Sequence, residues 1–212
     1  MRKISPIIIP AIQIEIQPIW DELIEKYQSS VGVVSGGFYP TETFWYLAHT
    51  HNNSTLVHSV SSHLYAEIGN YKFDSSYRLL KSVVLESFFS LRESLARLVN
   101  VVYSLQEDAP KSGASSRILK KAKRSNLTVA DYLSELIPPT SRLGSYLENY
   151  RHPYVHREDL SGFTVQDVTA AMIGKEQPRV TAFITKSYET SRWMQKIESH
   201  IAQECTTRLK LS

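Results

Sequence analysis

The sequence has a single cysteine, Cys205, among its 212 residues. One cysteine cannot form an internal disulfide, so nothing indicates an oxidising compartment, and we interpret the thiol as a packed or idle group. No apolar run reaches the ~18 residues that a membrane span needs. Pro6 and Pro10 interrupt the Ile-rich N-terminus, and no small-residue cleavage site follows it, which argues against a signal peptide. We therefore expect a cytoplasmic protein without a membrane partner.

Several enzyme motifs are also missing from the sequence. It has no Gly-rich phosphate loop, no nucleophile elbow and no paired Asp/Glu cluster with metal spacing, so ATPase, hydrolase and metallonuclease functions have no support. The separations of four histidines do not give the i, i+4 pair of a helical zinc site. We interpret residues 49–63 as a polar, solvated segment and expect no metal or cofactor, with the alternative that one histidine reaches a catalytic cleft. The four are His49, His51, His58 and His63.

The overall composition is that of an ordinary globular protein, with 42% hydrophobic and 21% charged residues. Its length suits one domain with a substantial core. The net charge of +3 is compatible with an RNA partner but does not require one.

Helical periodicity dominates the chain. The clearest element runs from about Ser76 to Leu105, where apolar residues recur at steps of three and four without Gly or Pro. We predict a mainly α fold, a helical bundle that forms one domain over residues 1–212, with 1–70 as an N-terminal extension whose role the sequence does not define. Further helices are predicted after Pro18, from Thr41, from a Thr128/Asp131 capping box to Leu136, after Thr140 or Ser141, and from Ser187 to Leu209.

Two segments have the character of extended chain. Residues 4–17 alternate partly between apolar and polar side chains, which predicts a short strand or arm. Residues 179–184 read Arg-Val-Thr-Ala-Phe-Ile and are predicted to form a strand. Pairing of the two would bring the ends of the chain together as a small strand pair.

The most informative segment is Asn-Tyr-Arg-His-Pro-Tyr-Val-His-Arg at positions 149–157. RNA can be cleaved without a metal when its own 2′-OH attacks the adjacent phosphate. The reaction needs a base, an acid and a cation against the charge that develops on the phosphate. Histidine titrates near neutral pH. Arginine stays charged, and its planar guanidinium donates paired hydrogen bonds to phosphate oxygens. Arg151 and His156 supply these groups.

The spacing of this pair needs support from its context. About one such Arg–His pair is expected by chance in this chain. Residues five apart on a helix lie about 140° apart around its axis, and Pro153 should kink or loosen the helix so that Arg151 and His156 converge. The pair follows an apolar helix, with His152 directly after the arginine and Val155 before the histidine.

This arrangement resembles the HEPN superfamily over about residues 76–160. The resemblance implies a helical bundle in which Arg151 stabilises the scissile phosphate, His156 transfers a proton or orients the 2′-OH, and His152 assists. It also implies a homodimer with a composite site, acting as an RNA-cleaving toxin, host-defence effector or processing enzyme, with a cognate antitoxin or regulatory partner. Two departures from the family pattern are Pro153 inside the motif and Glu158, where one toxin branch carries a tyrosine that its antitoxin modifies.

Other interpretations of these residues stay open. Arg151 and His156 also suit a plain helix end, and HEPN folds that only bind or dimerise provide a non-catalytic alternative. Glu86 and Glu93 are each either a partner for Arg151 or simply exposed. We interpret residues 111–125 as a flexible basic segment or short helix that either contacts RNA phosphates or is merely solvated. The predicted RNA-binding residues are Arg117, Lys120, Lys121, Arg124 and Arg157.

Overall fold

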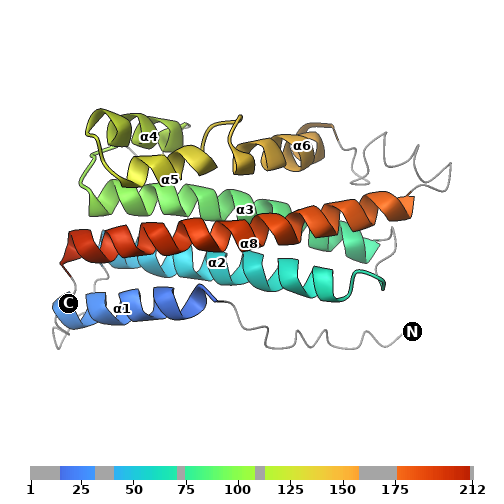
Figure 1. The fold of residues 1–212 in the computed structure, drawn as a ribbon, viewed down its shortest axis with the longest axis horizontal. Helices are drawn as coiled ribbons and strands as arrows, with labels where there is room; N and C mark the ends of the chain where they lie inside the picture. Colours follow the sequence, from blue (N-terminus) through green and yellow to red (C-terminus); the bar gives the residue numbers. More distant parts are fainter. Residues whose placement is uncertain (1–14, 32–40, 71–74, 108–112, 158–175, 211–212) are drawn as a thin grey trace.

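The computed structural model of the chain describes residues 15–31, 41–70, 75–107, 113–157 and 176–210, with the backbone alone for 31, 75–76, 78, 152–157 and 176–178. Every regular element in these ranges is a helix, which confirms the predicted mainly α bundle (Figure 1). No described helix has both the length and the apolarity needed to cross a membrane. The helices are α1 (Gln17–Val31), α2 (Glu42–Ala66), α3 (Ser75–Val102), α4 (Ala114–Arg124), α5 (Val129–Leu136), α6 (Arg142–Arg157) and α8 (Glu176–Leu209).

Helices α1, α2, α3 and α8 lie side by side along the longest axis, and α4, α5 and α6 cover α3 from one side (Figure 1). Helix α2 runs opposite to its three long neighbours (Figure 1). The predicted helix over 76–105 is confirmed as α3, and its apolar face is fully buried at Val84, Phe88, Leu91, Leu95 and Leu98. Because α3 contacts α2, α8 and all three covering helices, it is the spine of the core.

Helices α1 and α2 belong to this same core. Trp20 and Leu23 of α1 are buried in one hydrophobic cluster with Leu47, Val57 and Leu64 of α2. The described part of residues 1–70 is therefore built into the bundle. Residues 1–14, which include most of the predicted extended arm, lie outside the described residues.

A buried polar network joins α2 to α1 and α8, and it corrects the expectation of a solvated segment at 49–63. His58 and Glu198 are both fully buried, and His58 Nε2 lies 2.6 Å from Glu198 Oε1. The other carboxylate oxygen accepts a hydrogen bond from Trp20 Nε1 at 3.1 Å, and His58 Nδ1 lies 2.7 Å from Ser191 Oγ. His58 is accommodated inside the protein because α8 supplies a partner for each of its ring nitrogens.

The predicted strand over residues 179–184 is wrong, because these residues form the beginning of α8. Val180, Phe183 and Ile184 are buried at helical spacing. The ring of Tyr150 packs edge-on against Phe183, with centroids 5.3 Å apart, and Tyr146 Oη is 2.8 Å from Ser187 Oγ. Packing against α6 outweighs the strand preference of the β-branched and aromatic residues here.

The start of α6 is tightly fixed. Ser141 Oγ accepts a hydrogen bond from the Gly144 backbone N–H at 3.0 Å, so Ser141 serves as the predicted cap. A Cβ at Gly144 would collide with the Pro138 carbonyl, so only glycine lets the helix lie against the Pro138–Pro139 turn. Helix α5 ends before these prolines as predicted, but the Thr128 side chain forms no cap hydrogen bond.

Replacing Glu198 with alanine should lower the free energy of unfolding by about 3–5 kcal/mol, because it leaves His58 and the Trp20 N–H buried without their partner. Urea denaturation measures this loss. The matched control is Glu189→Ala on the same helix, where an exposed ion pair with Lys186 at 3.4 Å is worth less than about 1 kcal/mol. Equal losses for the two variants would contradict the structural role of the network.

Candidate functional site

Arg151, the first residue of the predicted motif, is held against α3. Its Nη2 donates to Glu86 Oε2 at 3.3 Å, and its Nε lies 3.2 Å from Glu86 Oε1 as an ion-pair contact without hydrogen-bond geometry. The guanidinium carbon is 3.9 Å from the centroid of the Phe89 ring. The side chain of Arg151 is 23% exposed and that of Glu86 46%. Glu86 is thus the partner of Arg151, and the guanidinium is fixed in direction while part of it faces solvent.

A second arginine, from the same helix, also packs on the ring of Phe89. The guanidinium carbon of Arg92 lies 4.7 Å from the Phe89 centroid. Arg92 also donates to Glu93 from Nε at 3.2 Å and from Nη2 at 2.9 Å. Glu93, the alternative partner predicted for Arg151, instead accepts from Arg92 and from Ser115 Oγ at 2.6 Å. Both carboxylates on this face of α3 are therefore matched to an arginine.

The rest of the motif is described through its backbone alone. Helix α6 continues across Pro153 to Arg157, so convergence through loss of the helix at Pro153 is not found. Residues 151 and 156 then lie about 140° apart around the axis and about 7.5 Å apart along it. The side chains of His152, His156 and Arg157 lie outside the described part of the structure.

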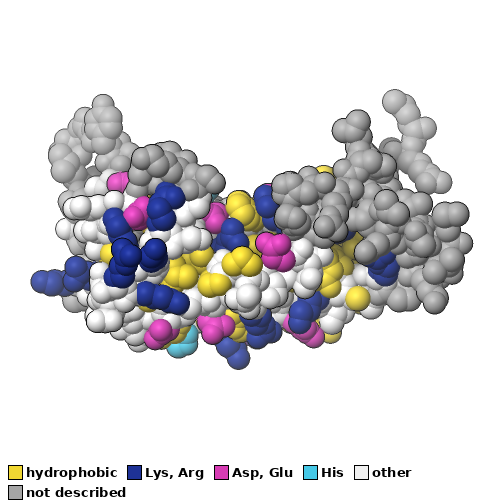
Figure 2. All heavy atoms as spheres, turned by 90° about the horizontal axis from the view of Figure 1, so that it is seen from above, with side chains coloured by type: hydrophobic (Ala, Val, Ile, Leu, Met, Phe, Trp, Pro, Cys, Tyr) yellow, Lys and Arg dark blue, Asp and Glu magenta, His cyan; other side chains and the backbone are white. Residues whose placement is uncertain are grey.

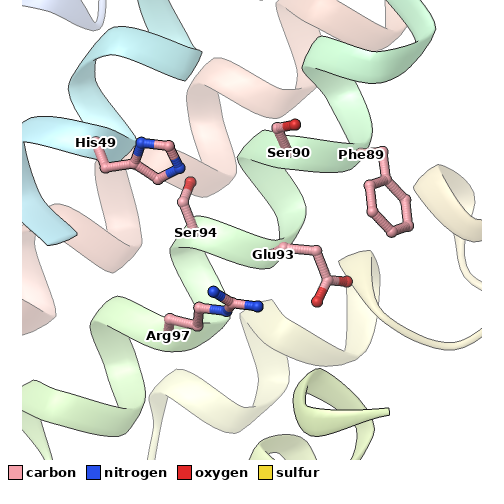
Figure 3. A pocket seen from close by; sticks show the side chains of 6 residues that line it. All are labelled: His49, Phe89, Ser90, Glu93, Ser94 and Arg97. Atoms are coloured by element: carbon pink, nitrogen blue, oxygen red, sulfur yellow. The ribbon is translucent and has the colours of Figure 1, made fainter. Parts of the chain in front are cut away.

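A pocket of about 210 Å³ opens beside this arginine cluster, between α2 and α3 (Figure 3). His49 reaches it from α2, and the side chains of Ser94, Glu93 and Arg97 surround it from α3 (Figure 3). Phe89 belongs both to its lining and to the Arg151 contact, so the pocket and Arg151 are neighbours. The lining residues are His49, Phe89, Ser90, Glu93, Ser94 and Arg97.

The electrostatics of the pocket centre on Arg97. No carboxylate among the described residues forms an ion pair with it, and its Nε is buried without a hydrogen-bond partner there. Burial lowers the pKa of His49, and the nearby Arg97 charge lowers it further, so the imidazole is neutral near pH 7. The His49 ring stacks on Trp45 with centroids 4.9 Å apart. The pocket thus combines an unneutralised cation with a neutral imidazole.

Sequence reasoning missed Arg97 and left His49 as one alternative among four. A signal was present, because the α3 positions 86, 89, 90, 93, 94 and 97 recur at steps of three and four on one side of the helix. The α2 side of the pocket had no such signal, since residues 49–63 lack amphipathic periodicity.

The predicted basic segment is an ordered helix, α4, because Ile118, Leu119 and Ala122 bury one of its faces. Lys and Arg side chains gather at the end of the molecule where α4 lies (Figure 2). Of the predicted RNA-binding residues, Lys120 and Arg124 are exposed. Arg117 and Lys121 instead contact Glu107, at 2.9 and 3.1 Å, and so tie α4 to the chain that follows α3.

Among the described residues, no group of three or more His, Cys, Asp or Glu side chains is placed to hold a metal ion. Cys205 is fully buried, and this burial raises the pKa of its thiol to about 12, as suits a packed thiol without chemistry. Comparison with family models, curated proteins and solved structures gave no match.

The contacts of Glu107 predict a dependence of stability on pH. Hydrogen bonds from Arg117 and then Lys121 hold the pKa of Glu107 below its ordinary 4.5, so its contribution is present above that value and is lost as the pH falls through the lowered pKa. Glu107→Gln should lower the urea midpoint at pH 7, and its difference from wild type should shrink as the pH falls below 4.5 and through the lowered pKa. The control is Glu135→Gln, an exposed carboxylate on α5. A Glu107 effect that is independent of pH would contradict the ion-pair assignment.

Proposed function

We propose that the protein is a metal-independent endoribonuclease of the HEPN type. The observation that carries the proposal is the placement of Arg151, whose partly exposed guanidinium is oriented by Glu86 and Phe89. It lies beside a pocket lined by a second arginine, Arg97, which has no carboxylate partner among the described residues. A preoriented cation at a site open to a substrate is what stabilisation of a phosphorane-like transition state requires.

The reaction follows from the chemistry of the motif. The 2′-oxygen of a ribose attacks the adjacent phosphorus, and the bond from phosphorus to the 5′-oxygen of the next nucleotide breaks. A base takes the proton of the 2′-OH, and an acid donates one to the leaving 5′-oxygen. His156 serves as one of these two groups, His152 assists as the other, and Arg151 stabilises the charge on the phosphate oxygens. The products carry a 2′,3′-cyclic phosphate and a 5′-hydroxyl.

The proposal includes a homodimer with a composite site. Positions 151 and 156 lie about 140° apart around the axis of one continuous helix, which favours a site shared between two copies over convergence of both residues within one copy. Two α6 helices related by a two-fold axis can place Arg151 of one copy opposite His156 of the other. The HEPN resemblance extends the proposal to a toxin or host-defence effector that a cognate antitoxin or other partner regulates.

A specific observation favours a second candidate, a non-catalytic HEPN-like module that dimerises or binds other molecules. Arg151 already has a carboxylate partner in Glu86 and an aromatic partner in Phe89. A phosphate would have to replace or share the Glu86 contact. In this second function Arg151 is a structural residue, wild-type protein cuts no RNA, and Arg151→Ala changes stability or self-association alone.

Cleavage of single-stranded RNA by the full chain, alone or with its natural activator, tests the first candidate. We expect cleavage that survives EDTA and leaves 2′,3′-cyclic phosphate ends, and a loss of at least about 100-fold in rate for His156→Ala and for Arg151→Ala. His200→Ala, which changes an exposed histidine on α8 that stacks on Tyr132, should cleave like wild type. Unchanged cleavage by the two motif variants, or none by wild type, would rule out the nuclease.

A further inference from the structure

We propose that the pocket between α2 and α3 binds a phosphate of single-stranded RNA through Arg97, with the neighbouring base stacked on Trp45. This inference rests on the proposed function and gives it a second substrate contact, away from the motif itself. Arg97 differs from Arg92 and Arg151, the other arginines of this face, because it has no carboxylate partner among the described residues.

The charges around the pocket add up to a site for one anion. Glu93 is the only acidic residue in the lining, and it is neutralised by Arg92 at 2.9 Å and hydrogen-bonded by Ser115. Arg97 therefore leaves one positive charge in the pocket, with its Nε buried and unpaired among the described residues. A phosphodiester has the charge and the oxygen geometry that match a partly buried guanidinium whose Nε has no partner among the described residues.

Neutral donors complete the phosphate contact. Burial and Arg97 both keep His49 uncharged, so its imidazole does not compete with the arginine and can donate one N–H to a phosphate oxygen. The Ser90 hydroxyl lines the pocket, and none of the described residues forms a hydrogen bond with it. Ser94 adds no donor, because its hydroxyl already donates to the Leu91 carbonyl at 3.0 Å.

Trp45 provides the aromatic surface that single-stranded nucleic acid requires. Its side chain is 50% exposed although it stacks on His49, one helical turn further along α2. An exposed indole at the rim of a cationic pocket is the combination of stacking surface and phosphate contact by which proteins bind single strands. Phe89 also lines the pocket, and its ring packs against the guanidinium of Arg151. We therefore place the bound RNA along α3, from Arg97 towards the motif.

Binding of a labelled, single-stranded 2′-O-methyl RNA oligonucleotide, which has no 2′-OH to react, tests the inference by fluorescence anisotropy. We expect Arg97→Gln to weaken binding about tenfold at low salt and to reduce the slope of log K against log salt by about 0.7, the share of one phosphate contact. Arg97→Lys keeps the charge and should keep most of the slope. Trp45→Ala should weaken binding about tenfold without changing the slope.

The matched control is Lys196→Gln on α8, which removes an exposed charge outside the pocket and should bind like wild type. Competition with inorganic phosphate and with AMP distinguishes sources of the anion. We expect both to compete far more weakly than unlabelled RNA. Full competition by AMP at the concentration where RNA competes would mean a nucleotide site and overturn the RNA assignment, and an Arg97→Gln variant with wild-type affinity and slope would overturn the site itself.

RNA binding by the pocket and RNA cleavage by the motif can be separated experimentally. RNA cleavage that depends on His156, together with binding that Arg97→Gln leaves unchanged, would overturn the pocket and leave the nuclease standing. Binding that depends on Arg97 without any cleavage would support the pocket and remove the nuclease. Wild-type protein that binds no RNA oligonucleotide would overturn the pocket assignment directly.

Discussion

The buried contact between His58 and Glu198 fixes how α2 sits in the bundle. The buried face of α2 is too polar to be positioned by apolar packing alone, and a misplaced carboxylate inside the core would be costly. Glu198 forms polar contacts with both His58 and Trp20. These contacts fix the rotation of α2 about its own axis relative to α1 and α8. His49 lies nine residues before His58, about 180° around the helix, and is therefore turned towards α3. The network that stabilises the core thus also orients His49 towards the pocket.

Helix α3 connects the core to the candidate site. Its apolar side packs in the bundle, whereas its polar side presents Phe89 between two arginines and places Arg97 beside His49. Glu86 and Glu93 each form an ion pair with one arginine, whereas Arg97 has no carboxylate partner in the part of the chain that the structure describes. The same helix therefore orients Arg151 of α6 and forms most of the pocket, which makes its polar face the natural path for an RNA strand in the proposed function.

The sequence predicted the elements that have clear periodicity. Helix α3 was located within a few residues, and the buried Cys205 and the Glu86 partner were among the stated possibilities. It did not predict α2 as a core helix, because the buried His58 has its polar partners on α8, 130 or more positions away. The strand over 179–184 was wrong for the same reason, since its residue Phe183 is buried against Tyr150 of another helix. Arg97 and His49 come from different helices, so only the tertiary structure brings them together.

The central claim is that Arg151 of one copy and His156 of the other form one catalytic site. Mixing inactive Arg151→Ala protein with inactive His156→Ala protein, after exchange of subunits, tests it most directly. Random exchange makes half of the dimers mixed, and each mixed dimer regains one of its two sites, so the account predicts about a quarter of the wild-type RNA cleavage rate. A mixture that stays as inactive as the separate variants, although the subunits have exchanged, would contradict the claim.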